Sequence, residues 1–314
     1  MLAVVTGGSG FIGSHVVDKL RDRGIRVRVF DMSKPRTRDD VEYYQGSLLD
    51  IDAIQMAFAG ADAVFHLAAI ADVNEVFESP LRSEAINARG TINVLEAARW
   101  AKVKRVIYGS TIWVYSEVTD SEVDEDTPLG SPTHLYTSTK LVGEYYCKAY
   151  SELYGLETTV LRYGIPYGPR SRPAGVIPIF VRRALEKQPI TIQGDGLQFR
   201  KFIYVEDVAE GNVLALKPQA ANKTYNLEGN EKVSIKELAE IVKRIIGDVD
   251  IQYTEGRPGD FEGKEISNLR AAKDLDWHPK VAVEEGIRRY IEWYKSSEET
   301  KKNLWTSVDK SILE

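Results

Sequence analysis

The residues whose types and spacing could do chemistry lie near the middle of the chain, in HLYTSTK at 134–140. On a helix, Tyr136 and Lys140 would lie one turn apart on the same face. Free tyrosine has a pKa of about 10, but a neighbouring ammonium group stabilises tyrosinate and makes it a usable base. The chain has 16 tyrosines, so roughly one such pair is expected by chance. The surrounding sequence therefore has to decide between a helix surface and an acid–base pair.

A second candidate site follows the apolar segment LAVVT, where the sequence continues as TGGSGFIGSH at 6–15. The spacing of Gly7, Gly10 and Gly13 allows a tight turn, a close approach of backbone to a pyrophosphate, and packing of a helix on a strand. The start of that helix offers free amides and a positive dipole end to phosphates. This context, a strand before and a helix after, is the one that a dinucleotide site requires.

An acidic residue stands where a ribose acceptor is expected. The segment IRVRVFD ends in Asp31, about twenty residues after the glycine turn. A carboxylate there accepts hydrogen bonds from the adenosine ribose and repels a 2′-phosphate, so NAD is favoured over NADP. Two nearby arginines, Arg36 and Arg38, could bind a 2′-phosphate, so NADP remains an alternative cofactor.

These residues need a scaffold, and the first half of the chain predicts one. Short, β-branched apolar segments alternate with helical patterns, which indicates a parallel, doubly wound sheet with right-handed crossovers. We expect strands at 2–6, 25–30, 41–45, 62–68, 104–110 and 157–163, and helices at 11–24, 51–59, 83–101 and 136–154. Binding sites of such sheets lie at the carboxyl ends of the strands, where Thr111 follows the fifth strand.

The pattern changes after Tyr163, where GIPYGPRSRPAG reads as a loop or domain hinge. Helices near 176–187, 205–217, 234–247 and 283–296 and short strands at 189–193 and 224–229 predict a smaller α+β lobe. We expect a Rossmann domain at 1–165, to which 203–228 returns, and a substrate lobe at 166–202 and 229–314.

Composition excludes several classes of protein. A net charge of −6 gives no general basic field, so we expect no nucleic-acid or membrane partner. The single cysteine, Cys147, allows neither an intramolecular disulfide nor a cysteine-rich metal site, and the four histidines show no ligand spacing. No apolar leader or 18-residue apolar run is visible, which favours a cytoplasmic location.

Five motifs together carry a family resemblance: TGGSGFIG, HLAA at 66–69, GST at 109–111, YTSTK at 136–140 and LRYGIPYGPR at 161–170. They occur in the order seen in extended short-chain dehydrogenases/reductases. More narrowly, the chain resembles the nucleotide-sugar epimerase/dehydratase group and its UDP-glucose 4-epimerase-like members. The resemblance implies a Rossmann domain with tightly bound NAD, a nucleotide-sugar lobe, and a homodimer formed through helices 83–101 and 136–154.

The resemblance also implies roles for individual residues. Tyr136 would be the acid–base group, Lys140 its helper and Thr111 the donor to the reacting hydroxyl, whereas His66 is expected to be structural. Cofactor contacts carried over by position are Gly7, Gly10, Phe11, Ile12, Gly13, Asp31, Ser47, Leu48, Leu67, Ala68, Ala69, Asn87, Ser110, Tyr136, Lys140 and Tyr163. Substrate contacts, with a nucleotide-diphosphate sugar such as a UDP-hexose, are Thr111, Tyr136, Thr191, Gln193, Arg200, Arg257 and Asp260.

The two residues after Thr111 indicate the reaction. Dehydratases of this group carry an Asp-Glu pair there, and decarboxylases a glutamate at the second place, but this chain has Ile112 and Trp113. Neither can move a proton, which favours a 4-epimerase acting through a transient 4-keto sugar. Alternatives are a 4-keto reductase, a uronate or N-acetyl-sugar epimerase, a dehydratase or decarboxylase, and a non-catalytic NAD-binding scaffold. The sequence departs from the family pattern at Ser47, Trp113, Gly164, Ile165 and Lys201. The identity of the sugar is therefore not determined by the resemblance.

Overall fold

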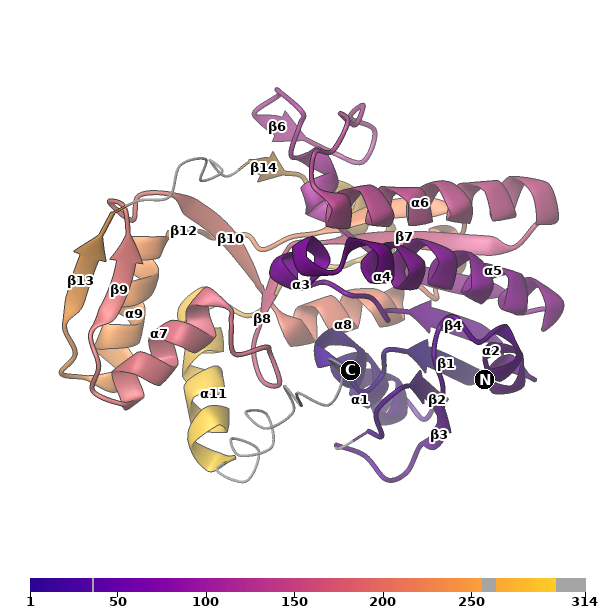
Figure 1. The fold of residues 1–314 in the computed structure, drawn as a ribbon, viewed down its shortest axis with the longest axis horizontal. Helices are drawn as coiled ribbons and strands as arrows, with labels where there is room; N and C mark the ends of the chain where they lie inside the picture. The colour runs from indigo at the N-terminus through magenta and orange to yellow at the C-terminus, as the bar shows by residue number, and fades with distance from the viewer. Residues whose placement is uncertain (36, 256–263, 298–314) are drawn as a thin grey trace. The chain divides into compact units, whose positions relative to one another are not determined.

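A computed structural model of the chain describes residues 1–35, 37–255 and 264–297. They form two compact units (Figure 1). The first comprises Met1–Pro166, Val205–Glu228 and Lys264–Pro279; the second comprises Tyr167–Tyr204 and the described residues of 229–263 and 280–314. Within the described residues, no helix is both long enough and apolar enough to span a membrane.

The first unit contains the predicted parallel sheet, with seven strands in the order β11-β7-β5-β4-β1-β2-β3. All neighbouring strands in it run parallel. The bounds are β1 Leu2–Thr6, β2 Arg26–Asp31, β3 Glu42–Gln45, β4 Ala63–His66, β5 Arg105–Thr111, β7 Glu157–Tyr163 and β11 Lys223–Leu227. Thr111 pairs with Tyr163, so the ends of β5 and β7 lie side by side at the carboxyl edge.

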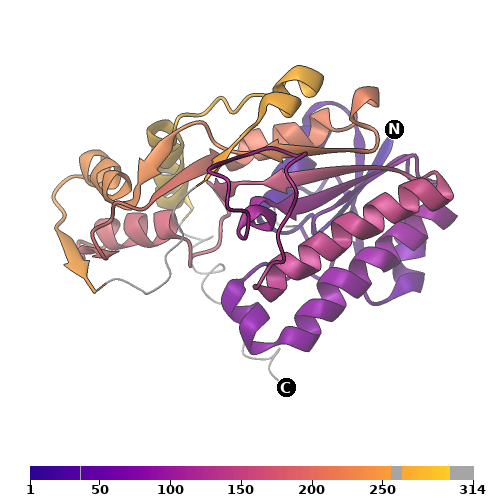
Figure 2. The ribbon, with the colours of Figure 1, turned by 90° about the horizontal axis from the view of Figure 1, so that it is seen from above.

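Helices cover both faces of this sheet, as a doubly wound fold requires. One face carries α1 (Phe11–Asp22) against α8 (Val205–Leu214), and the other carries α2 (Ile51–Phe58), α5 (Gly90–Trp100) and α6 (Leu135–Tyr154). Figure 2 shows α5 and α6 running alongside each other over the sheet. Buried apolar side chains such as Phe58, Leu95 and Val106 fill the space beneath them.

The helix predicted over 83–101 differs in detail. It begins as α4 (Pro80–Glu84), passes through a π-helical turn (Ala85–Arg89) and continues as α5. A short helix that the sequence did not predict, α3 (Val73–Glu78), precedes it and is capped by the Asp72 carboxylate. Such π turns widen the backbone and occur often near functional sites.

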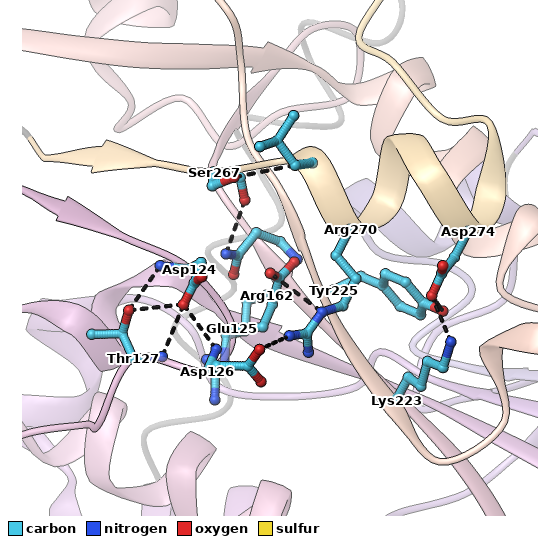
Figure 3. Close-up of polar contacts among 12 residues, drawn as sticks. Asp124, Glu125, Asp126, Thr127, Arg162, Lys223, Tyr225, Ser267, Arg270 and Asp274 are labelled. Carbon is cyan, nitrogen blue, oxygen red and sulfur yellow. Dashed lines mark hydrogen bonds and ion pairs between the residues drawn. The ribbon is translucent and has the colours of Figure 1, made fainter.

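Residues 264–279, assigned from the sequence to the second lobe, belong to the first unit. Here β14 (Glu265–Ile266) pairs with β6 (Glu122–Val123), and α10 (Leu269–Leu275) packs on β11. Figure 3 shows the contacts that fix this segment: Arg270 reaches Glu125 and Asp126, and Asp274 accepts from Lys223. These polar contacts between distant segments leave no periodic signal in the sequence.

The second unit is smaller and mixed, as predicted. The strands are β9 (Ile190–Gln193) parallel to β13 (Ile251–Thr254), and β10 (Phe199–Tyr204) antiparallel to β12 (Lys232–Ser234). Its helices are α7 (Val176–Leu185), α9 (Ile235–Ile246) and α11 (Val283–Ser296), and β8 (Ile165–Tyr167) spans the junction between the units. Helix α9 begins with a capping box in which Ser234 and Glu237 satisfy each other's backbone amides.

Candidate active site

The candidate catalytic residues come from two neighbouring elements. Thr111 is the last residue of β5, and Tyr136 lies in the first turn of α6, which packs against β5. Burial raises the pKa values of Tyr108 and Tyr163, and the nearness of Tyr136 adds to both shifts. The Tyr136 ring therefore lies close to β5 and to the end of β7.

Lys140 is a buried cation one turn further along α6. Its side chain is 6% exposed, and its Nζ lies 4.8 Å from the centroid of the Tyr108 ring. Burial lowers the pKa of Lys140 to about 8, while the neighbouring Cys147 and Glu144 act in the opposite direction. An ammonium group with this pKa is still charged at neutral pH and can stabilise a tyrosinate nearby.

His66 is structural, as predicted, and it sits in a chain of buried hydrogen bonds. The backbone amide of Ala68 donates to Thr6 Oγ1, which lies 2.8 Å from His66 Nδ1. His66 Nε2 lies 3.0 Å from Thr91 Oγ1, and Thr91 donates to the carbonyl of Asn87. Thr91 uses its proton on Asn87 and so accepts from Nε2, which therefore carries a proton. Burial lowers the pKa of His66 to about 3, so the ring is neutral at pH 7 and Nδ1 accepts from Thr6.

This histidine should make the fold sensitive to acid. Below its ordinary pKa of 6.5, the unfolded chain binds a proton that the folded chain rejects until the pH is near 3. The free energy of unfolding should therefore fall by about 1.4 kcal/mol per pH unit as the pH drops below 6.5. In urea titrations between pH 7 and 4.5, His66→Gln should lose this slope, because glutamine can both donate and accept here. The exposed control His278→Gln should keep it; parallel curves for parent and His66→Gln would disprove the assignment.

The glycine turn fits a dinucleotide. Gly7 has a φ of +71°, and a Cβ there would lie 2.7 Å from the backbone nitrogen of Ala68. A Cβ on Gly13 would lie 2.0 Å from the carbonyl oxygen of Gly7, so α1 approaches the turn more closely than any side chain permits. Gly10 caps α1 without a side-chain hydrogen bond, which leaves the helix N-terminus open for a pyrophosphate.

Asp31 lies at the end of β2 beside this turn. Its Oδ2 accepts from the amide of Ser9 at 3.1 Å and its Oδ1 from that of Ser33 at 2.9 Å. Burial raises the pKa of Asp31, and these amides partly offset the rise. Arg38 forms ion pairs with three carboxylates, those of Asp18, Asp22 and Asp40. These partners already neutralise the charge with which Arg38 would bind the 2′-phosphate of NADP. Arg36 lies outside the described residues.

Asp31→Ala should weaken NAD binding by roughly 10- to 100-fold, since a hydrogen bond to a charged group contributes about 1.5–3 kcal/mol. The substitution should also reduce the preference for NAD over NADP, because it removes the negative charge that repels the 2′-phosphate of NADP. Calorimetric titration of cofactor-free protein with NAD and NADP measures both effects. Alanine at the exposed neighbour Asp39 is the control, and unchanged affinities in Asp31→Ala would exclude this placement.

Three expected cofactor residues make structural contacts. The Ser110 hydroxyl donates to Glu144 at 2.5 Å, so its side chain supports the site, and the expected contact with the cofactor stays a prediction. Asn87 lies in the π turn, and its amide group holds both the N–H and the C=O of Ile70, which fixes the segment after β4. The Tyr163 hydroxyl donates to Asn212 at 2.7 Å.

Other predicted positions fall as follows. Leu67, Ala68 and Ala69 follow β4 beside the glycine turn, Phe11 and Ile12 open α1, and Leu48 is buried against Gly90. Ser47 accepts from the amide of Leu49. In the second unit, Thr191 and Gln193 alternate on β9, Thr191 accepts from Arg183, and Arg200 lies on β10. Arg257 and Asp260 lie outside the described residues.

Two supporting residues escaped the sequence analysis. His134 caps α6, since its Nδ1 accepts from the amide of Tyr136 at 3.2 Å. Gly143 lets α6 approach β5, because a Cβ there would lie 2.1 Å from the Tyr108 hydroxyl. The sequence shows a histidine before a predicted helix and a glycine within it, but it does not show that they contact the Tyr136 amide and the Tyr108 ring.

A Rossmann sheet, a dinucleotide turn, a Tyr-Lys pair on α6 and a threonine at the end of the adjacent β5 define a short-chain dehydrogenase/reductase of the extended type. Residues 3–227 match the model of the NAD dependent epimerase/dehydratase family. The chain belongs to this family, and its cofactor is NAD.

Individual relatives agree with this. The crystal structure of UDP-glucose 4-epimerase from Thermotoga maritima, determined with UDP-glucose, is 34% identical with a TM-score of 0.89, and the match covers 95% of this chain and 99% of that one. The Thermus thermophilus UDP-glucose 4-epimerase in complex with NAD is 34% identical with a TM-score of 0.85, covering 95% and 100%. A UDP-glucuronate 4-epimerase from Thermodesulfobacterium geofontis is 32% identical over 319 residues, covering 96% and 98%.

Proposed function

We propose that the chain is an NAD-dependent nucleotide-sugar 4-epimerase of the UDP-glucose/UDP-galactose type. The observation that carries the proposal is that Tyr136 and Lys140 lie one turn apart on α6, which packs against β5, the strand that ends at Thr111. The two residues after Thr111 cannot move a proton. Ile112 packs against the apolar cluster that contains Val114, and Trp113 is 42% exposed. A dehydratase would need an additional acid and base at these places.

The chain's own residues would divide the work as follows. Bound NAD supplies a hydride acceptor that later returns the hydride. Tyr136, held as tyrosinate by Lys140, takes the proton of the sugar 4-hydroxyl and gives it back to the 4-oxygen after the sugar has turned. Thr111 donates a hydrogen bond to that oxygen and keeps it within reach of the phenol. One proton carrier therefore serves both halves of the reaction.

The substrate would be held by the second unit. Thr191 and Gln193 on β9 suit a nucleotide base, and Arg200 suits a diphosphate because its planar fork matches phosphate oxygens. Arg257 and Asp260 complete the proposed set from outside the described residues. The UDP-glucose bound to the Thermotoga maritima relative supports UDP as the nucleotide.

An NMR assay with a panel of nucleotide sugars tests the proposal. UDP-glucose and UDP-galactose should interconvert, and NADH should not accumulate. Loss of water from the sugar, or net NADH formation, would contradict an epimerase. The relative from Thermodesulfobacterium geofontis makes UDP-glucuronate the second candidate substrate, and its inclusion separates a uronate epimerase from a hexose epimerase.

We also propose a homodimer formed through α5 and α6. Five large apolar side chains on these helices are exposed: Trp100, Leu135, Tyr145, Leu153 and Tyr154. Leu141 on α6 is buried with Val114 and Tyr115, so it is not part of this exposed set. Exposed apolar clusters of this kind usually mark partner surfaces.

Light scattering at micromolar concentration should therefore give twice the mass of one chain. Tyr145→Glu combined with Leu153→Glu should give monomers, because both substitutions place charge in an apolar interface. Glutamate at the exposed Leu269, on α10, is the control. A monomeric parent would disprove the dimer.

A further inference from the structure

Behind the catalytic pair lies a buried ion pair. Tyr136, Lys140 and Glu144 follow one another at four-residue spacing on α6 and so share one face. Arg162 on β7 donates to Glu144 twice, from Nη2 to Oε2 at 2.7 Å and from Nε to Oε1 at 3.1 Å. Glu144 is 8% exposed and Arg162 is 5% exposed. Since a buried ion pair is often no better for stability than apolar packing, its presence here points to another use.

The pair joins the elements that carry the site. Ser110, the residue before Thr111, donates to Glu144 Oε1 at 2.5 Å. On the other side, Arg162 Nη1 donates to the Tyr115 hydroxyl at 2.6 Å, and that hydroxyl donates to Asn226 at 3.0 Å. A single carboxylate on the catalytic helix thus holds the end of β5 directly and the turn after Thr111 through Arg162.

Few titratable groups lie close enough to Lys140 to act on its charge. The titratable groups near it are Tyr108 on β5, His66 on β4, and Tyr136, Cys147 and Glu144 on α6. Burial raises the pKa of Tyr108 and of Cys147 and lowers that of His66 to about 3, so these three are neutral near pH 7. In the described part of the chain, no carboxylate is within ion-pair distance of Lys140 Nζ. Glu144, ion-paired with Arg162, is the standing negative charge that acts on it.

We propose that Glu144 is a positioning residue of this site: held by Arg162 and Ser110, its carboxylate provides the counter-charge for Lys140 and ties α6 to the end of β5. The inference rests on the proposed acid–base role of Tyr136 and Lys140. It predicts that the pair sets the pH range in which both residues work.

The direction of the effect follows from the sign of the charge. Removing a negative charge favours the less protonated form of each neighbouring group. In Glu144→Gln, both Tyr136 and Lys140 should lose their protons at lower pH, and the positive charge left on Arg162 acts in the same direction. The whole bell of kcat/KM against pH should move to lower pH by about one unit.

Two measurements test this. The first is the pH profile of turnover in the parent and in Glu144→Gln. The second needs no sugar: the tyrosinate absorbance of NAD-loaded protein is titrated, and the same variant carrying Tyr136→Phe is subtracted to isolate one tyrosine. Tyr136 should titrate about one pH unit lower in Glu144→Gln. If the chain acts on another substrate, the pH profile of turnover cannot be measured, but the titration of Tyr136 still tests the role of Glu144.

A matched control lies at the opposite end of the same two strands, where Arg105 on β5 pairs with Glu157 on β7 at 2.6 Å. Glu157→Gln should move neither titration. Because Glu144→Gln leaves Arg162 buried without a partner and can impair folding, the double variant Glu144→Gln, Arg162→Gln is the second test. It carries no unpaired charge and should show a smaller shift in the same direction.

The outcomes separate cleanly. Lower pH midpoints in Glu144→Gln and the double variant, with unchanged midpoints in Glu157→Gln, support the inference. If either folded variant has a lower melting temperature but a titration that superimposes on the parent's, the pair is merely structural and the inference is wrong.

Discussion

Tyr136→Phe is expected to lower turnover by roughly 100- to 10,000-fold, the usual contribution of a general acid–base group. The ring still fills its place near Tyr108 and Tyr163, so the purified protein should keep its NAD. Steady-state assays with UDP-glucose or UDP-galactose measure the rate, and release of NAD on denaturation measures the bound cofactor. The loss should appear in kcat, because the phenol carries the proton in both halves of the reaction.

Tyr145→Phe is the matched control for this variant. Tyr145 lies on the same helix but is 59% exposed, so loss of its hydroxyl should leave the rate unchanged. Near-parental activity in Tyr136→Phe, or equal losses in both variants, would remove Tyr136 from the mechanism.

Lys140→Met is expected to do two opposite things: stabilise the fold and abolish most of the activity. Burial lowers the pKa of Lys140 from 10.5 to about 8, so the folded protein holds a charged lysine at neutral pH at a cost on the order of 3 kcal/mol. An uncharged side chain of similar length removes that cost. Turnover should fall at least 100-fold, because the tyrosinate loses its cation.

The pH dependence distinguishes this account from a packing effect. Between pH 8 and 10.5 the unfolded chain binds a proton at this position that the folded chain has already lost, so the parent gains stability as pH rises. The advantage of Lys140→Met in urea unfolding should thus be complete below pH 8 and disappear by pH 10.5. Lys148→Met, on the same helix with a 74% exposed side chain, should show no such change. A destabilised Lys140→Met protein would contradict the buried charge.

The strands and helices of the sheet could be predicted from the sequence because their buried faces carry regularly spaced apolar residues. The segments 157–163 and 283–296 begin and end where predicted, since the first is rich in β-branched and aromatic residues and the second has a clear helical period. Thr111 lies at the end of β5, one residue beyond the predicted end of that strand. Parallel strands put their carboxyl ends at one edge, so this placement followed from topology alone.

The support of the site could not be predicted in the same way. Glu144, Arg162 and Ser110 are far apart in the chain, and a buried carboxylate has the same one-letter code as a solvated one. Likewise, Leu141 on α6 is buried in a second apolar cluster that includes Val123, a residue far from it in the sequence. Such partners are set by long-range packing, which overrides local pattern.

The return of residues 264–279 to the first unit has a consequence for how the chain is made. A ribosome that has released residue 228 has delivered all seven strands of the parallel sheet, yet Glu125 still lacks Arg270, and the carbonyl of Asp207 still lacks the indole of Trp277. The nascent NAD-binding unit therefore has to wait through the synthesis of another segment of its neighbour before its last contacts can close. During that interval the surface that later buries the Trp277 side chain is uncovered. A chain stopped at residue 228 would keep that surface uncovered.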